Sequence, residues 1–249
     1  MGKLEGKVVL VTGASSGIGA AIAQLLATEG ASLALVARDV TALDKVADEI
    51  HRQGGKAFVL PADITDDEQI NAAVGEARLK LGRLDILVNS AGVMLLGPIV
   101  DGNIKEWRRM IEINTLGLMF AVHAALPAMI AQGAGHIVNI SSVAGRVVWS
   151  AGAGVYMASK FAVNAFSESL RQEVAEKKIR VTVIEPGIVA TPLTQKIGDS
   201  TARAQAEAYY ASMEPLRPED IAAAVAYAAT QPPNVNVNEI LVRPTAQIQ

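Results

Sequence analysis

A glycine-rich stretch near the start of the chain, VVLVTGASSGIGAAIA at residues 8–23, restricts the fold more than any other feature. The apolar run Val8–Val11 is typical of a buried strand, and a helical pattern follows the glycines. Between strand and helix, Gly13, Gly17 and Gly19 let the backbone turn tightly and approach a ligand closely. The N-terminus of the helix offers free N–H groups and the positive end of its dipole to an anion. The stretch therefore predicts a phosphate-binding strand–loop–helix unit; the alternative is a tight turn that binds no ligand.

Short apolar runs alternate with longer amphipathic stretches along the rest of the chain. Runs of this length between turn signals are typical of strands buried on both faces, and their alternation with helices predicts right-handed crossovers in a parallel sheet. We therefore expect an α/β fold in which residues 1–249 form a single doubly wound Rossmann-type domain. It would have a mostly parallel sheet of about seven strands with helices on both faces. The expected strands are Val8–Val11, Leu33–Val36, Ala57–Leu60, Ile86–Val88, Ile137–Ile140, Val181–Ile184 and Ile240–Val242.

Helical periodicity marks the stretches between the expected strands. In the stretch Asp66–Leu81, Thr65 is the expected N-cap, and Glu68 three residues later completes a capping box. The stretch Thr191–Pro215 is less regular and follows the C-terminal end of a strand, where ligands bind in such sheets. It is expected to be either a mobile flap over the substrate or a plain surface helix. The other expected helices are Ala20–Glu29, Thr41–Gln53 and Ala162–Lys177.

Composition excludes several classes of function. The net charge of −3, without a block of like charges, argues against a nucleic-acid-binding surface. Cysteine is absent, so disulfides and thiolate catalysis are excluded, and His51, His123 and His136 lack the spacing of metal ligands. The run Val8–Val11 is too short to cross a membrane and leads into the glycine-rich turn. We expect no metal, no nucleic acid and no membrane partner, and a cytoplasmic location.

Five motifs follow one another along the chain: TGASSGIG at 12–19, NSAG at 89–92, Asn114 in a helical stretch, Ser142 followed by Tyr156 and Lys160, and Pro186-Gly187 after the sixth strand. In this order they make the chain resemble the short-chain dehydrogenase/reductase family over essentially its whole length. The fragments MLLGP, AGRV, NAFSESLRQEV and VIEPG are most similar to the bacterial subgroup that contains clavulanic acid dehydrogenase and NADP-dependent hydroxy-acid or serine dehydrogenases. The second motif reads NSAG where the family has N-N-A-G, so Ser90 replaces one asparagine.

Tyr156 and Lys160 stand four residues apart in VYMASKF, so on a helix they share one face. A free tyrosine loses its proton near pH 10, whereas a proton-transfer catalyst works best with a pKa near the operating pH. Lowering that pKa to about 7 needs ~4 kcal/mol of preferential phenolate stabilisation. A lysine ammonium and a positively charged nicotinamide can supply it in a partly dry cleft. The alternative is an ordinary surface contact between the two side chains.

Two further polar residues complete the expected proton-transfer group. Ser142 follows an expected strand and can donate a hydrogen bond to a substrate carbonyl; its neighbour Ser141 is expected to bond to backbone. Asn114 lies in an apolar helical stretch, where a buried amide needs partners. The resemblance implies that Asn114 holds a water linking Lys160 to solvent; the alternative is an amide that satisfies local carbonyls.

The end of the second expected strand, LALVARDV, bears on the choice of nicotinamide cofactor. Ala37 stands where the resemblance places an NAD-selecting acid, and Arg38 follows, which favours NADP over NAD. Asp39 could reach the ribose after a small shift, so NAD stays the alternative cofactor. The alternative role for Arg38 is a solvated surface charge. Thr191 is expected to bind the nicotinamide carboxamide, to cap a helix, or both. The expected cofactor-binding residues are Gly13, Ser15, Ser16, Gly17, Ile18, Gly19, Arg38, Asp63, Ile64, Asn89, Ala91, Gly92, Tyr156, Lys160, Pro186, Gly187, Ile188 and Thr191.

The substrate site is expected to be mostly apolar. Arg146 could clamp a carboxylate but is more often, in such a loop, a surface charge. Tyr209 and Tyr210 lie in the expected flap, 191–215. The apolar residues expected near the cleft are Met94, Leu95, Leu96, Val147, Val148 and Trp149.

The resemblance implies an NADP-dependent oxidoreductase that transfers a hydride between nicotinamide and a small carbonyl or alcohol, with Asn114, Ser142, Tyr156 and Lys160 as catalytic residues. The alternatives are an NADP-binding sensor or scaffold without turnover, and an epimerase or dehydratase on the same fold. The resemblance also implies a homotetramer, or a dimer, formed through helices such as Ile104–Ala131 and Val155–Lys177.

Overall fold

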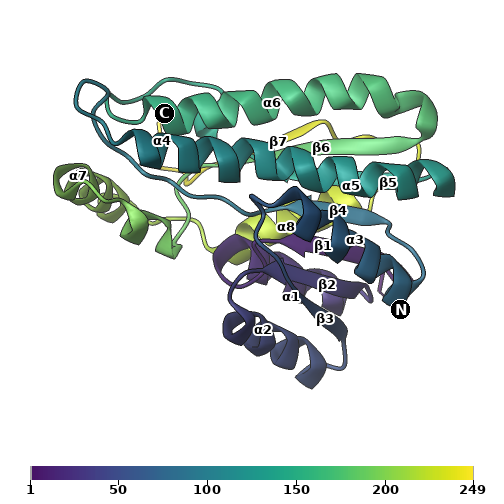
Figure 1. The fold of residues 1–249 in the computed structure, drawn as a ribbon. Coiled ribbons are helices and arrows are strands. Elements are labelled where there is room, and N and C mark those ends of the chain that lie inside the picture. The colour runs from purple at the N-terminus through teal and green to yellow at the C-terminus, as the bar shows by residue number, and fades with distance from the viewer. Residues whose placement is uncertain (1, 249) are drawn as a thin grey trace.

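The computed structural model describes residues 2–248 and contains one seven-stranded sheet (Figure 1). Its strand order is β3-β2-β1-β4-β5-β6-β7, and every neighbouring pair is parallel. The expected α/β fold with a Rossmann-type parallel sheet is confirmed. The strands are β1 (Val8–Thr12), β2 (Ser32–Ala37), β3 (Lys56–Pro61), β4 (Ile86–Asn89), β5 (Gly135–Ile140), β6 (Ile179–Pro186) and β7 (Glu239–Val242).

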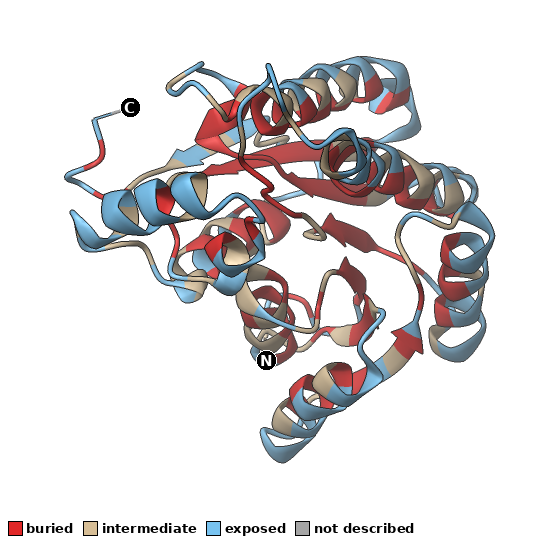
Figure 2. Cartoon of the chain, turned by 60° about the vertical axis from the view of Figure 1, so that its left-hand side comes forward, coloured by how far each residue is buried: buried red, intermediate tan, exposed pale blue. Residues whose placement is uncertain are grey.

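Helices cover both faces of the sheet. Helices α1, α2 and α8 share one apolar core with the sheet, and α3, α5 and α6 share the other. In Figure 2 the strands are red along most of their length, whereas the outer surfaces of the helices are blue. The helices are α1 (Gly17–Thr28), α2 (Val40–Arg52), α3 (Asp67–Leu81), α4 (Ile104–Ile111), α5 (Gly117–Gln132), α6 (Gly154–Val174), α7 (Ser200–Ala211) and α8 (Pro218–Ala229).

Helix boundaries correct two expectations. The N-cap of α3 is Asp66, whose carboxylate accepts from the Gln69 N–H at 3.0 Å, and not Thr65. Thr65 instead donates to Asp63, because an Asp two residues upstream offers its backbone and hydroxyl a nearer acceptor. The long helix expected from Ile104 is also interrupted: a π turn, Glu112–Leu116, joins α4 to α5.

One helical stretch, Ile104–Gln132, is long and apolar enough by length and composition to cross a membrane. However, 56% of its most apolar window is buried inside the protein, and α5 packs on α3, β4 and β5. Its apolar character is therefore that of a core helix.

The irregular stretch after β6 is folded. A 3-10 helix, Pro192–Lys196, leads into α7, which lies beyond the end of the sheet at the left of Figure 1. The apolar side of α7 contributes Ala206, and in part Ala202, to a third core cluster, which also contains Tyr156. Helix α7 is thus placed beside the C-terminal ends of the strands, where ligands bind in such sheets.

Candidate active site

A cleft of about 1600 Å³ runs along the C-terminal ends of the strands. It crosses the gap between β1 and β4, where the strand order changes direction, the usual ligand position in a doubly wound sheet. Its volume exceeds that of a typical pocket for one small ligand, so the cleft has room for more than one. The loop after β1 lines one part of it and α7 another.

The loop after β1 is shaped for close approach of an anion. Gly13 has a φ of +67°, and a Cβ there would lie 2.7 Å from the Ala91 backbone. A Cβ on Gly19 would lie 2.3 Å from the Gly13 carbonyl oxygen. The N-cap Ser16 makes no side-chain capping bond, and the first turn of α1 has no acidic residue. The N–H groups of this helix start are therefore available for a phosphate.

Arg38 and Asp63 face each other at one end of the cleft. The Arg38 Nη1 lies 3.5 Å from an Asp63 carboxylate oxygen, and both residues line the cleft. Asp39, the acid that left NAD as the alternative cofactor, is the N-cap of α2 and accepts a hydrogen bond from the Ala42 N–H at 3.0 Å. Its carboxylate is engaged in capping, so Arg38 is the charged group best placed to meet a ribose 2′-phosphate.

Asn89 does not line the cleft, in contrast to its expected role. Its Nδ2 donates to the Asn139 Oδ1 at 2.9 Å, and the side chain is buried between β4 and β5. Asn89 is the last residue of β4, and its side chain is directed to Asn139 on the neighbouring strand. The loop that follows it does line the cleft. The N–H groups of Ser90 and Ala91 donate to the Thr12 hydroxyl, which ties this loop to the end of β1. Asn89 is therefore a supporting residue.

Ser142 and Tyr156 come together at the centre of the cleft. Burial raises the pKa of the Tyr156 phenol, and its hydrogen bond with the Ser142 hydroxyl opposes that shift. Ser142 Oγ accepts from the Ala144 N–H at 3.1 Å and lies 3.4 Å from the Pro186 carbonyl oxygen. Ser141 turns away and donates to the Lys160 carbonyl, as expected. Ser142, and not Ser141, is the serine placed beside the phenol.

Lys160 lies one helical turn beyond Tyr156 and is buried. Its Nζ donates to the Ile140 carbonyl at 3.0 Å and lies 6.0 Å from the centre of the Tyr156 ring. Burial lowers the Lys160 pKa to about 8. The lowered Tyr156 pKa expected from the sequence is therefore not a property of the protein alone, because burial dominates. A bound positive charge would have to supply the additional phenolate stabilisation that lowers the Tyr156 pKa.

Asn114 is held at the π turn by three hydrogen bonds. Its Oδ1 accepts from the Val93 N–H at 2.8 Å, and its Nδ2 donates to the Val93 carbonyl and to Ser159 Oγ. The amide thus joins the loop after β4 to helix α6. Because these partners are distant in sequence, the amide does not satisfy local carbonyls, and the expected water link to Lys160 stays a prediction. Asn114 is placed to fix the position of α6.

The segment after β6 forms the wall opposite the phosphate loop. Pro186, Gly187, Ile188 and Thr191 all line the cleft, as expected for cofactor-binding residues. Thr191 is the N-cap of the 3-10 helix but makes no side-chain capping bond. A residue that the sequence did not suggest, Gln247, also lines the cleft and accepts from the Ile188 N–H at 2.9 Å. No motif marks it, because only the fold brings the tail to this wall.

The end of the cleft beside α7 is mostly apolar but also carries the charged side chains of Lys196 and Asp199, and its apolar lining differs from the expected set. Leu95 is buried behind the wall, and Val147 and Val148 are exposed outside it. Arg146 is not a carboxylate clamp: it is paired with Glu185 and Glu239 away from the cleft. The residues that do line this end include Met94, Leu96, Trp149, Leu193, Tyr209 and Tyr210.

The sequence profile of short chain dehydrogenases matches residues 7–202. The chain belongs to the short-chain dehydrogenase/reductase family. An uncharacterized oxidoreductase of Staphylococcus saprophyticus is 42% identical over 247 residues, which cover 98% of this chain and 100% of the relative.

Solved members of the family have the same fold. The closed form of a serine dehydrogenase complexed with NADP+ superposes with a TM-score of 0.90 at 33% identity, covering 97% of this chain and 96% of that one. A metagenomic short-chain oxidoreductase in complex with NADP gives a TM-score of 0.82 at 37% identity, covering 98% and 100%. The narrower subgroup expected from the sequence stays a prediction. Within residues 2–248, no group of three or more His, Cys, Asp or Glu side chains is arranged to hold a metal.

Proposed function

We propose that the protein is an NADP-dependent oxidoreductase that transfers a hydride between nicotinamide and a small carbonyl or alcohol. The observation that carries the proposal is the placement of Ser142, Tyr156 and Lys160 together, in a cleft that continues to the open N-terminus of α1. Two solved relatives contain NADP or NADP+, which supports the choice of cofactor. The loop glycines, the free helix start and Arg38 fit the pyrophosphate and the 2′-phosphate of such a molecule.

In the direction of reduction, the Ser142 hydroxyl donates to the substrate carbonyl oxygen and polarises it. The bound nicotinamide supplies the hydride that the carbonyl carbon accepts. The Tyr156 phenol gives its proton to the same oxygen, which completes the alcohol. The Lys160 ammonium stabilises the phenolate that remains until a proton returns. Asn114 is a positioning residue: its hydrogen bonds hold helix α6, and with it Tyr156, in place.

The substrate is an uncharged carbonyl with an apolar body. The lining of the substrate end supports this, as does the engagement of Arg146 by two glutamates outside the cleft. Helix α7 covers this end as the flap, 191–215, and contributes Tyr209 and Tyr210. The Tyr210 pKa is raised by burial and by the nearby Tyr156, which supports a position facing the reacting group.

The proposal extends to assembly and location. We propose a homotetramer, with a dimer as the alternative, and a cytoplasmic location. Two apolar side chains are about two-fifths exposed on this side of the protein: Leu116, in the π turn just before α5, and Phe161, on α6. They support assembly through these helices.

The test is a spectrophotometric screen of carbonyls with NADPH and with NADH. A matched pair such as pentanal and succinic semialdehyde differs mainly in the carboxylate. We expect NADPH oxidation with the neutral aldehyde and much weaker activity with the charged one. A protein that binds NADPH but oxidises it with no carbonyl would instead be a sensor or scaffold.

A further inference from the structure

The proposed catalytic serine stands at the start of a short turn that leaves the sheet after β5. Just before it, the Ser141 N–H still donates to the Ile184 carbonyl of β6 at 2.8 Å. Ser142 is then the N-cap of a 3-10 helix, Val143–Gly145. We call residues 142–146 the serine turn. A helix of this length has little stability of its own, so the position of the Ser142 hydroxyl depends on where the far end of the turn is attached.

A buried carboxylate, Glu185 of β6, holds the far end of the serine turn. Its side chain is fully buried, and its Oε2 accepts from the Arg146 Nε at 2.5 Å. Arg146 directly follows the 3-10 helix and also pairs with Glu239 of β7. A hydrogen bond between two charged groups is stronger than one between neutral groups. The serine turn is thus tied to β6 on both sides of Ser142, by Ile184 before it and by Glu185 after it.

The other oxygen of the same carboxylate bonds to the helix that carries Tyr156 and Lys160. Glu185 Oε1 accepts from the Asn164 Nδ2 at 2.7 Å, and that amide also donates to the Gly145 carbonyl at 3.2 Å. Asn164 stands four residues after Lys160 and eight after Tyr156, so the three share one side of α6. One side chain therefore joins the serine turn to the helix of the phenol.

The serine turn also packs closely against α6. Three atoms lie 2.9 Å from the position that a Cβ on Gly145 would take: Asn164 Nδ2, the Lys160 carbonyl oxygen and Ser141 Oγ. Gly145 has no positive φ that would require glycine, so the close approach is what excludes a side chain there. The Glu185 carboxylate bonds to groups on both sides of this contact.

Stability alone is a weak explanation for this buried carboxylate. Burial raises the pKa of Glu185, and the hydrogen bond and charge of Arg146 oppose that shift. The cost of removing such charges from water can exceed their attraction, and apolar residues of similar volume often replace a buried ion pair without loss of stability. A pair that lies between two reacting groups is better explained by what it positions.

We propose that Glu185 is a positioning residue, which sets the place of the Ser142 hydroxyl relative to the Tyr156 phenol. This inference rests on the proposed function, because it needs a carbonyl that both groups reach. Glu185 is fully buried and does not line the cleft, so it touches neither substrate nor cofactor. It acts on the chemical step through the serine turn and leaves NADPH binding unaffected.

The test is a double-mutant cycle between Glu185→Gln and Ser142→Ala in the full-length protein, with a neutral aldehyde and saturating NADPH. Glutamine keeps the shape of the side chain and can still accept from Asn164, but it offers Arg146 no charged acceptor. In the presence of Ser142 we expect kcat to fall about 5- to 50-fold, because a small misplacement of a reacting group is costly. In the Ser142→Ala protein the same change should lower kcat less than about twofold, since no hydroxyl is left to position.

Two further measurements separate positioning from a general loss of structure. The dissociation constant of NADPH should stay the same in Glu185→Gln, so that the loss falls on kcat alone. Arg146→Met breaks the same contact from the partly exposed side and should reproduce that loss. Single turnovers with excess enzyme keep the slow Ser142→Ala proteins measurable. Glu168→Gln is the matched control: Glu168 is exposed on α6, where it pairs with Arg171, and neither kcat nor NADPH binding should change.

The outcomes are distinct. If Glu185→Gln lowers the stability of the protein but leaves kcat of the folded enzyme unchanged, the role is structural and the proposal is overturned. An equal loss of kcat with and without the Ser142 hydroxyl overturns it as well, because Glu185 would then act elsewhere. A wild-type protein that binds NADPH but reduces no carbonyl overturns the proposed function and this inference together.

Discussion

At the residue scale, the burial of the Lys160 ammonium lowers the free energy of unfolding of the protein. Its ammonium is buried with a carbonyl partner, and burial lowers its pKa from 10.5 to about 8. That difference corresponds to roughly 3 kcal/mol against folding while the group stays charged. The folded protein binds this proton less tightly than the unfolded chain, so the penalty is complete below about pH 8 and disappears as the pH rises through 10.5.

Lys160→Met should therefore stabilise the protein while removing its activity. We expect the free energy of unfolding at pH 7 to rise by about 1–2 kcal/mol, after the lost hydrogen bond to Ile140 is allowed for. The gain should shrink between pH 8 and pH 10.5. Denaturant unfolding of both proteins across this range measures it. A variant that is less stable at pH 7, or a gain independent of pH, would contradict this account of Lys160.

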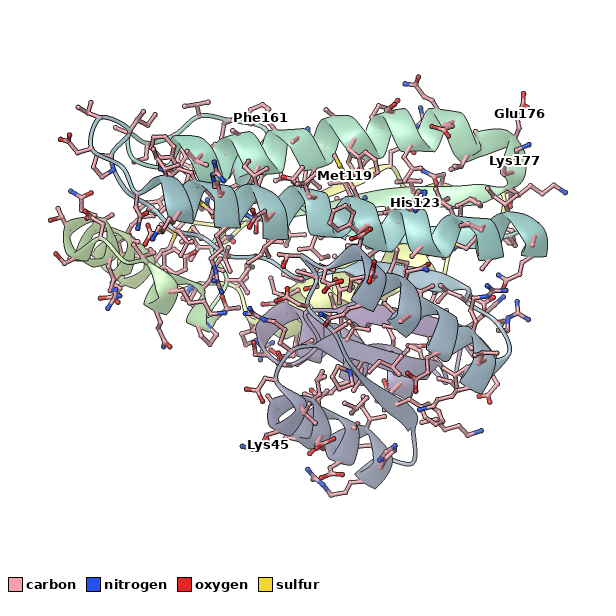
Figure 3. All side chains as sticks on the ribbon, viewed as in Figure 1. Lys45, Met119, His123, Phe161, Glu176 and Lys177 are labelled. Carbon is pink, nitrogen blue, oxygen red and sulfur yellow. The ribbon has the colours of Figure 1, made fainter. Side chains whose placement is uncertain are left out.

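Arg38 is the residue that we propose sets the preference for NADP over NAD. Replacing Arg38 with Ala should weaken NADPH binding about 10- to 100-fold, because a charge-assisted contact with the 2′-phosphate is lost, and should leave NADH binding nearly unchanged. Lys45→Ala is the matched control: Lys45 is exposed on α2 (Figure 3) and does not line the cleft. Equal losses for both cofactors would refute the assignment.

At the element scale, Asp85 joins the starts of β1, β4 and β5 at the edge of the sheet opposite the cleft. Its carboxylate accepts from the Val8 N–H at 3.0 Å, from Lys7 and from Arg83, while its backbone bonds to Val8 and His136. Burial raises the Asp85 pKa, but the hydrogen bonds from Arg83, Val8 and Lys7 outweigh this and lower it overall. The stabilisation is therefore present above the ordinary pKa of 3.8 and is lost as the pH falls through the lowered value.

Asp85→Ala should destabilise the sheet without disturbing the cleft. We expect a loss of about 2–3 kcal/mol at pH 7, because the buried Val8 N–H and two cations lose their acceptor, and a smaller loss below pH 4. KM should not change. Asp44→Ala, an exposed change on α2, is the control for removal of a carboxylate. A stability loss below 0.5 kcal/mol in urea unfolding, or one that does not vary with pH, would rule out this role for Asp85.

Elements differed in how well the sequence predicted them, for physical reasons. All seven strands were predicted because each contains a short apolar run between turn signals. The run is buried throughout in β1, whereas the edge strands β3 and β7 are partly exposed. The cap of α3 was misplaced because Thr65 and Asp66 are both good N-caps, and only Asp63 decides which is free. The roles of Arg146, Asn89 and Gln247 depend on partners 39 to 93 residues away, which no local pattern contains.

For the whole molecule, assembly is expected through the face formed by α5 and α6. Figure 3 shows Met119 and His123 on α5 and Phe161 on α6 along the same side of the protein. Phe161 is 40% exposed there, so its ring is available for a contact between subunits.

Phe161→Asp should break the proposed tetramer into smaller species, because a desolvated charge would face its own copy across a symmetric interface. Light scattering after size exclusion measures the mass. Leu79→Asp, the same kind of change at an exposed position on α3, should leave the assembly intact. A monomeric wild-type protein, or a variant of unchanged mass, would exclude this face as the interface.

The central claim is that the Tyr156 phenol moves the proton during carbonyl reduction. The most direct test is the turnover of Tyr156→Phe at saturating NADPH with a neutral aldehyde, alongside its dissociation constant for NADPH. We predict a fall in kcat of at least about 100-fold with cofactor binding preserved, since only the proton donor is removed. Turnover close to that of the wild type, in a variant that still binds NADPH, would contradict the mechanism.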